Sequence, residues 1–297
     1  MLLIKKTIPI LFLFLIACHS NKSTKLIVQQ CDIIKNDFQS LGEPSMGSWR
    51  NQHPEEKEET LEAYIKKRPN SISFFKDKIY ILPLGEFSKE QEKIIEETRE
   101  FLTAYFGLKV VLLPTEKMPI VPSNQQREID GILQYNARYF IDKKLKTTNY
   151  SNAAALIAIT SYDLYPEESW NFVFGLSSLQ KGVGIWSLYR FGNPSHDTIA
   201  YNLCLNRTIK VSSHEISHIF SIKHCKQYTC LLNGANNIYE IDMRPVSLCP
   251  NCLAKLSYNF NSTPLVYFER MKKYWISKNN IVEGTKYNNL IQKIRRN

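Results

Sequence analysis

The sequence predicts an α/β fold with a mixed β-sheet. Strands and helices alternate from residue 78 to residue 160, which indicates parallel strands joined by helical connections. Two strands of an antiparallel pair are expected over 170–191, and a long helix over 199–220. Hydrophobic residues make up 43 % of the 297 residues and charged residues 22 %, so the chain can bury a sizeable core.

The first ordered unit is a strand, a helix and a strand. β-branched and aromatic residues predict a strand over 78–85. Ser88 and Gln91 match the capping-box pattern and Gly107 suits a helix C-terminus, so a helix is expected between them. The apolar run "LKVVLLP", residues 108–114, predicts a buried strand. The simplest arrangement pairs the two strands in parallel.

The middle of the chain predicts a helix and three strands. Ser123 and Gln126 repeat the capping pattern, which predicts a second helix over about 124–143. The run "AAALIAIT", residues 153–160, predicts another buried strand. The next two apolar segments, "WNFVFGLSS" and "GVGIWSLYRF", predict an antiparallel pair.

The rest of the organisation follows from composition. Residues 18–75 are polar and indicate a tether and an N-terminal extension, with one short helical segment near Leu61, Tyr64 and Ile65. A last helix is expected over about 263–280. No linker divides residues 76–280, which we take as one domain, and residues 281–297 are left as a C-terminal tail.

The N-terminus has the pattern of an export signal. Lys5 and Lys6 precede an apolar run that is too short to span a membrane comfortably, so residues 1–17 predict a signal peptide. The run ends in "LIAC", which resembles a bacterial lipobox and predicts a lipid on Cys18. An ordinary secretory leader and a short anchor helix are the alternatives. The expected location is the cell envelope, with the protein lipid-anchored at the outer membrane or cell surface.

The charge pattern does not indicate nucleic-acid binding. The formal net charge is +10, but basic residues are scattered among acidic ones, as in "PEEKEETLEAYIKKRP". No platform combines aromatic and basic residues. We therefore expect no nucleic-acid partner.

The stretch "HEISHIFSIKH" carries the strongest chemical signal. His214 and His218 are four residues apart, so a helix places both imidazoles on one face. Glu215 lies in the same turn and can hold a water without binding the metal itself. His224 can supply a third nitrogen if the helix ends and the chain turns back. Three nitrogens with one open position suit a catalytic zinc, although a His pair also occurs in cores and on surfaces.

Four cysteines follow this stretch closely. Cys225, Cys230, Cys249 and Cys252 have the spacing C-x4-C-x18-C-x2-C. In an oxidising compartment this cluster predicts two disulfides, but its spacing also suits a tetrahedral zinc site.

The segment from His214 to Cys252 resembles the archaemetzincin signature, H-E-x-x-H-x-x-G-x-x-H-C-x4-C followed by C-x2-C. The resemblance extends over about residues 75–280. It implies a metzincin-like catalytic domain with a mixed sheet, an active-site helix and a C-terminal zinc subdomain built on four cysteines. It also implies a peptidase acting on peptides or proteins, with two zinc ions. His214, His218 and His224 would bind the catalytic ion and Glu215 would be the general base; the second, structural ion would be bound by Cys225, Cys230, Cys249 and Cys252.

Two positions depart from that signature. Ser221 stands where the family has glycine, a position that needs positive φ and where serine costs about 1 kcal/mol. Leu232 stands where the family has methionine, and it fills a similar volume. These departures keep open a non-enzymatic, zinc-stabilised binding protein. The cysteines separately keep open a surface protein held by disulfides, with no metal.

Overall fold

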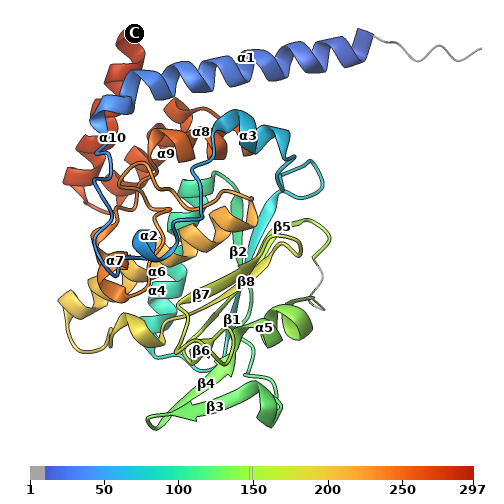
Figure 1. Ribbon diagram of the computed structural model, residues 1–297, viewed down its shortest axis with the longest axis vertical. Coiled ribbons are helices and arrows are strands. Elements are labelled where there is room, and N and C mark those ends of the chain that lie inside the picture. The colour runs from blue at the N-terminus through green and yellow to red at the C-terminus, as the bar shows by residue number, and fades with distance from the viewer. Residues whose placement is uncertain (1–10, 147, 149) are drawn as a thin grey trace, which may run out of the picture.

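The computed structural model describes residues 11–146, 148 and 150–297, with side chains from Ser23 onward (Figure 1). The first ten residues of the predicted signal peptide and the side chain of Cys18 lie outside this description. The first described helix is α1, Leu11–Ile34. Across the part of the chain that is described, no helix has both the length and the apolar character to cross a membrane.

A five-stranded sheet forms the centre of the molecule (Figure 1), with its strands in the order β2-β1-β5-β8-β7. β1, β2, β5 and β8 run parallel, and β7 is antiparallel to β8. The mixed sheet, the parallel first pair and the antiparallel hairpin are therefore confirmed. The strands are β1 Lys78–Leu84, β2 Lys109–Leu112, β5 Ala153–Thr160, β7 Gly175–Ser178 and β8 Val183–Ser187.

The central strands are buried on both faces. Alternating side chains of β1 enter different clusters: Ile79 and Ile81 join the large core beneath the helices, whereas Tyr80 and Leu82 join a second cluster with Phe140. Such two-sided burial explains why these strands are continuous apolar runs and not alternating ones.

The predicted helix after β1 is confirmed as α4, Lys89–Phe106. Both hydrogen bonds of the capping box between Ser88 and Gln91 form. Gly107 ends the helix with φ of +68°, a conformation that glycine adopts without steric cost.

The helix expected over 124–143 is wrong up to residue 136, and only its last residues are helical. Residues after a 3₁₀ turn, η2 Ser123–Gln125, form a hairpin of β3 Gln126–Ile129 and β4 Ile132–Asn136. Asp130 and Gly131 both have positive φ, the conformation of a type I′ hairpin turn. This Asp-Gly turn outweighs the capping pattern, and helical structure begins only afterwards. The helical segments are α5 Ala137–Tyr139 and the π-helical η3 Phe140–Leu145. A further strand, β6 Asp163–Tyr165, pairs with β4 and completes a second sheet in the order β3-β4-β6.

Helices form the C-terminal part of the chain. α7 Ile238–Met243 and α8 Pro250–Asn259 precede α9 Pro264–Ser277, which confirms the last predicted helix. The segment assigned to a tail forms a further helix instead, α10 Ile281–Arg296. Tyr287, Leu290, Ile291 and Ile294 of α10 are buried in the main core. The apolar spacing of these residues explains why the segment folds onto α9.

The N-terminal extension is also ordered. After α1 come the 3₁₀ turn η1 Lys35–Asp37 and two short helices, α2 Trp49–Gln52 and α3 Leu61–Lys66. α3 confirms the short helical segment, and its Tyr64 is buried in the main core. The extension therefore packs on the domain, and α1 packs on α8 from Ile27 onward, so these residues do not act as a tether.

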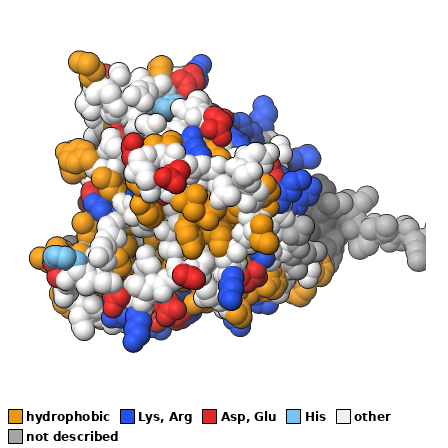
Figure 2. Space-filling model, turned by 90° about the horizontal axis from the view of Figure 1, so that it is seen from below, with side chains coloured by type: hydrophobic (Ala, Val, Ile, Leu, Met, Phe, Trp, Pro, Cys, Tyr) orange, Lys and Arg blue, Asp and Glu red, His pale blue; other side chains and the backbone are white. Residues whose placement is uncertain are grey.

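The surface carries both signs of charge. On the face shown in Figure 2, hydrophobic side chains gather near the centre, and acidic and basic side chains border them. The opposite charges are interspersed on this face, in line with their alternation along the sequence.

Candidate metal centre

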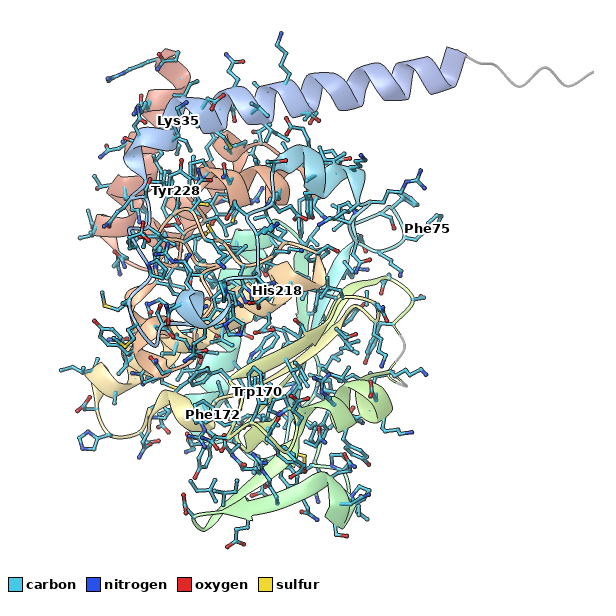
Figure 3. All side chains as sticks on the ribbon, viewed as in Figure 1. Lys35, Phe75, Trp170, Phe172, His218 and Tyr228 are labelled. Atoms are coloured by element: carbon cyan, nitrogen blue, oxygen red, sulfur yellow. The ribbon has the colours of Figure 1, made fainter. Side chains whose placement is uncertain are left out.

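Helix α6, Thr198–Ile219, presents the first histidines. Asp197 caps it by accepting a hydrogen bond from the Ala200 amide at 2.8 Å. His214 and His218 are one turn apart near its C-terminal end and point to the same side. Figure 3 places His218 between the sheet and the C-terminal helices, with Trp170 and Phe172 on the sheet side.

The helix ends in the turn that returns the chain toward these histidines. The Ser221 amide donates to His218 O at 2.8 Å and the Ile222 amide donates to Ser217 O at 3.2 Å. These two bonds form a Schellman motif with Ser221 at its left-handed position, φ +65°. The serine hydroxyl accepts a hydrogen bond from the Asn70 amide at 3.1 Å, which offsets part of its backbone strain.

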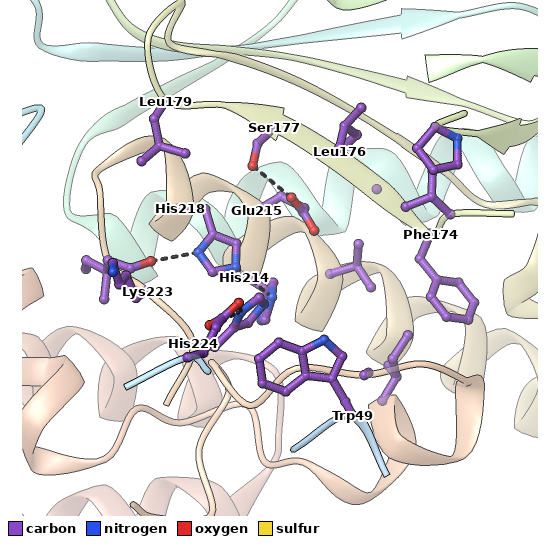
Figure 4. Close-up of a pocket in the computed structure, with 18 of the residues that line it drawn as sticks. Trp49, Phe174, Leu176, Ser177, Leu179, His214, Glu215, His218, Lys223 and His224 are labelled. Carbon is purple, nitrogen blue, oxygen red and sulfur yellow. Dashed lines mark hydrogen bonds and ion pairs between the residues drawn. The ribbon is translucent and has the colours of Figure 1, made fainter. Parts of the chain in front are cut away.

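Three imidazoles converge beyond this turn. One ring nitrogen from each of His214, His218 and His224 lies within 4.8 Å of the others (Figure 4). The Nε2 atoms of His214 and His218 are 2.9 Å apart. The structure thus brings together the three residues that the spacing singled out.

The Nδ1 atoms of these rings face acceptors. His214 Nδ1 lies 3.0 Å from Leu231 O, and His218 Nδ1 lies 2.6 Å from Ile222 O. When both Nδ1 atoms donate to these carbonyls, each Nε2 keeps an unshared electron pair turned toward the other ring, as two ligands of one ion do. These residues therefore fit a zinc ion.

Burial also keeps the imidazoles of His214 and His218 neutral, as metal ligands must be. Burial is the main cause that holds the pKa of His214 well below its ordinary value, and the positive charge of Arg244 lowers it further. Burial lowers the pKa of His218 to about 3.

Arg244 is buried beside His214. Its Nη1 donates to Asn233 O at 2.7 Å and lies 3.0 Å from His214 Nδ1. Burial lowers the Arg244 pKa to about 10, which still leaves the guanidinium charged at neutral pH. Its fixed charge therefore opposes protonation of His214.

Strand β7 holds Glu215 beside the histidine cluster. Ser177 Oγ donates to Glu215 Oε2 at 2.9 Å, and Figure 4 shows the other carboxylate oxygen directed away from Ser177. Burial raises the pKa of Glu215 above its ordinary value, and the Ser177 bond partly opposes that rise. Gly175 leaves the necessary room, since a Cβ there would lie 3.0 Å from Glu215 Cγ. The carboxylate is therefore basic and fixed in position.

The histidines and Glu215 line a cavity of about 550 Å³. Apolar walls come from Trp49, Phe174 and Leu176, and the cavity extends toward Trp170. This volume and its mostly apolar lining with a few polar groups are typical of a ligand-binding cavity.

The four clustered cysteines also converge. Their sulfurs lie within 4.8 Å of one another, and all four side chains are buried. Cys225 and Cys249 have sulfurs 3.6 Å apart, close to the edge of a zinc–thiolate tetrahedron, about 3.8 Å. The amides of Leu232 and Cys249 point at the Cys230 sulfur, at 3.5 and 3.3 Å. The Cys225 and Cys249 sulfurs are farther apart than the about 2.05 Å of a disulfide bond, and all four sulfurs converge on one point, as a metal site requires.

The two clusters are joined by main-chain contacts. Cys225 directly follows His224, and its amide donates to Leu232 O at 2.8 Å. Leu232 is fully buried and fills the position at which the signature has methionine. The cysteine cluster therefore fixes the segment that presents His224.

Several site residues have no signal in the local sequence. Trp49, Glu56, Ser177 and Arg244 all line the cavity, but none is one of the specified positions of the signature. Trp49 and Glu56 belong to the polar segment that composition assigns to a tether and extension. Only the folded chain shows that they reach the histidines.

Comparisons with known proteins show what the chain is similar to. Residues 77–258 match the model of peptidase family M54. Archaemetzincin-2 of Macaca fascicularis is 33 % identical over 246 residues, covering 71 % of this chain and 67 % of that protein. Archaemetzincin of Pyrococcus furiosus is 29 % identical over 186 residues, covering 61 % and 93 %. The crystal structure of archaemetzincin from Methanopyrus kandleri has the same fold, with a TM-score of 0.52 at 24 % identity over 63 % of this chain and 97 % of that one.

Proposed function

This chain belongs to peptidase family M54, the archaemetzincins, and from that premise we propose that Glu215 is the general base of its peptide-bond hydrolysis. Membership of this family makes the chain a zinc metallopeptidase, so its substrates are peptides or proteins. Family membership therefore favours an enzyme over a non-enzymatic binding protein. The observation that carries the proposal is the place of Glu215. Its carboxylate borders the same cavity as the three histidines but is not one of the converging ligand atoms.

The histidines and the glutamate have separate tasks in this proposal. His214, His218 and His224 would hold the catalytic zinc through one nitrogen each. When bound, the ion supplies a Lewis acid that makes water more acidic and polarises a carbonyl group. Glu215 accepts the proton from the attacking water, and its raised pKa makes the carboxylate a better proton acceptor. Ser177 keeps that carboxylate oriented toward the cavity.

A second zinc would be held by Cys225, Cys230, Cys249 and Cys252. The support for this count is geometric: four buried sulfurs meet at a spacing that suits a closed tetrahedral site. Its role would be structural, because the four buried sulfurs would fill all four positions of a tetrahedral site and the cluster anchors the chain after His224.

The test compares Glu215→Gln with the wild type. Glutamine keeps the shape of the side chain but cannot take a proton. The variant should retain the zinc content of the wild type and lose about 100-fold or more of its peptidase activity. The control His218→Ala should lose one zinc, since it leaves two nitrogen ligands. Unchanged hydrolysis by Glu215→Gln would show that another group is the base.

We further propose that the protein acts in the cell envelope, anchored by a lipid on Cys18. The support lies in the sequence alone: a basic pair, a short apolar run and a lipobox-like "LIAC". Cys18→Ser should move the protein from the membrane fraction to the soluble fraction. Retention of that variant in the membrane fraction would refute the lipid anchor.

A further inference from the structure

The N-terminal extension, residues 35–75, reaches the metal centre from outside the region that matches the family model, residues 77–258. Its backbone pairs with the segment that follows His224. Ser40 forms a bridge with Tyr228, and the Thr229 amide donates to Gln39 O at 2.8 Å. The extension is therefore held directly against the chain that presents the third histidine.

A second set of hydrogen bonds joins a later part of the extension to the same segment after His224. The Lys226 amide donates to Glu58 Oε2 at 2.9 Å, and Lys226 Nζ donates to the main-chain oxygen of His53. The extension thus holds the segment after His224 at two places, on either side of residue 49. Residues between these places are positioned by the fold and not by local sequence.

Trp49 is the buried contact between these two places. Its indole lies on the His224 ring with centroids 4.3 Å apart, and it stacks on His53 at 4.5 Å. Its amide donates to Glu240 Oε1 at 2.8 Å. A Cβ added to Gly234 would lie only 2.0 Å from the indole, so the loop after Cys230 leaves room for this ring. Figure 4 shows the indole forming one wall of the site.

Glu56 makes the polar contact. Its Oε2 lies 3.1 Å from His224 Nδ1, and a bond there leaves Nε2 as the nitrogen for a metal. His214 and His218 use main-chain carbonyls of the catalytic region for this purpose, whereas His224 uses a carboxylate of the extension. A carboxylate that accepts from a metal-bound histidine fixes the ring's tautomer and orientation and makes its other nitrogen a stronger ligand.

His224 needs such support more than the other two ligands do. His214 and His218 are fixed by helix α6, but His224 lies in an irregular segment and its side chain is 23 % exposed. We infer that Glu56 is a positioning residue for His224, and that the N-terminal extension is an integral part of the zinc site. This inference rests on the proposed function, because it takes the three histidines to be the zinc ligands.

The test measures zinc retention and does not depend on activity. Glu56→Ala, Glu56→Gln and the wild type are titrated with a chelator, and native mass spectrometry counts the zinc ions that remain. The matched control is Glu55→Ala, which removes an exposed carboxylate from the neighbouring residue. Glu56→Ala should release the histidine-bound zinc at chelator concentrations about 10- to 100-fold lower than the wild type and the control. Glu56→Gln keeps an acceptor oxygen and should fall between them.

The outcomes are distinct. Equal retention by Glu56→Ala and Glu55→Ala overturns the inference. Loss of both zinc ions from Glu56→Ala overturns it as well, because Glu56 would then support the whole fold and not His224. A wild type that binds zinc but cleaves no peptide contradicts the proposed function alone. A wild type whose histidines bind no zinc contradicts both.

Discussion

Substitution of Ser221 measures two opposed contributions to stability at the end of α6. Its left-handed backbone, φ +65°, costs a serine about 1 kcal/mol relative to glycine. Its hydroxyl accepts the Asn70 amide at 3.1 Å, a bond that contributes about 1 kcal/mol. Ser221→Gly removes both, so we expect the free energy of unfolding to change by less than about 0.5 kcal/mol.

Ser221→Ala separates the two contributions. Alanine keeps the backbone strain but removes the acceptor, so this variant should be less stable than the wild type by about 1 kcal/mol. For a chain of this size that difference lowers the melting temperature by about 2–4 °C. Denaturant and thermal unfolding of the zinc-loaded protein measure both values.

Two results would refute this reasoning. A gain of more than about 1 kcal/mol for Ser221→Gly would mean that the bond to Asn70 contributes nothing. Equal stability of the glycine and alanine variants would mean that the turn is not strained. Similar zinc content in all variants is the necessary control, since the turn also positions His224.

Three further substitutions test contacts around the site. Gly234→Ala should displace the Trp49 indole and lower the free energy of unfolding by about 1–3 kcal/mol, measured by denaturation; an unchanged midpoint would contradict the tight contact. Gly175→Ala should press on Glu215 Cγ and lower kcat by about 10- to 100-fold at unchanged zinc content, and wild-type kcat would show that the carboxylate is free to move. Cys249→Ser should lower the zinc count and the melting temperature together, because a structural zinc contributes on the order of 10 kcal/mol of binding free energy to folding. Disulfides among the four clustered cysteines, found by mass spectrometry, would contradict the zinc site.

Local pattern was enough for most of the sheet. The strand–helix–strand unit is encoded by a capping box, a terminal glycine and two apolar runs, all within neighbouring residues. The helix predicted over 124–143 was wrong because two local patterns compete there: the capping pattern of Ser123 and Gln126, and the Asp130-Gly131 turn. The turn determines the structure because it lets two short strands pair. α10 was missed because its apolar spacing matters only when α9 lies beside it.

The sequence by itself determined the atoms of the site. A spacing of four on a helix brings His214 and His218 together, and the cysteine spacing brings four sulfurs within reach of one ion. Only the tertiary structure decided what surrounds them. Glu56 bonds His224 across 168 residues, a contact that depends on how the whole chain closes and leaves no trace in any local period. The spacing of residues along the chain therefore identifies the metal ligands, whereas the residues that position those ligands are brought to them only by the tertiary fold.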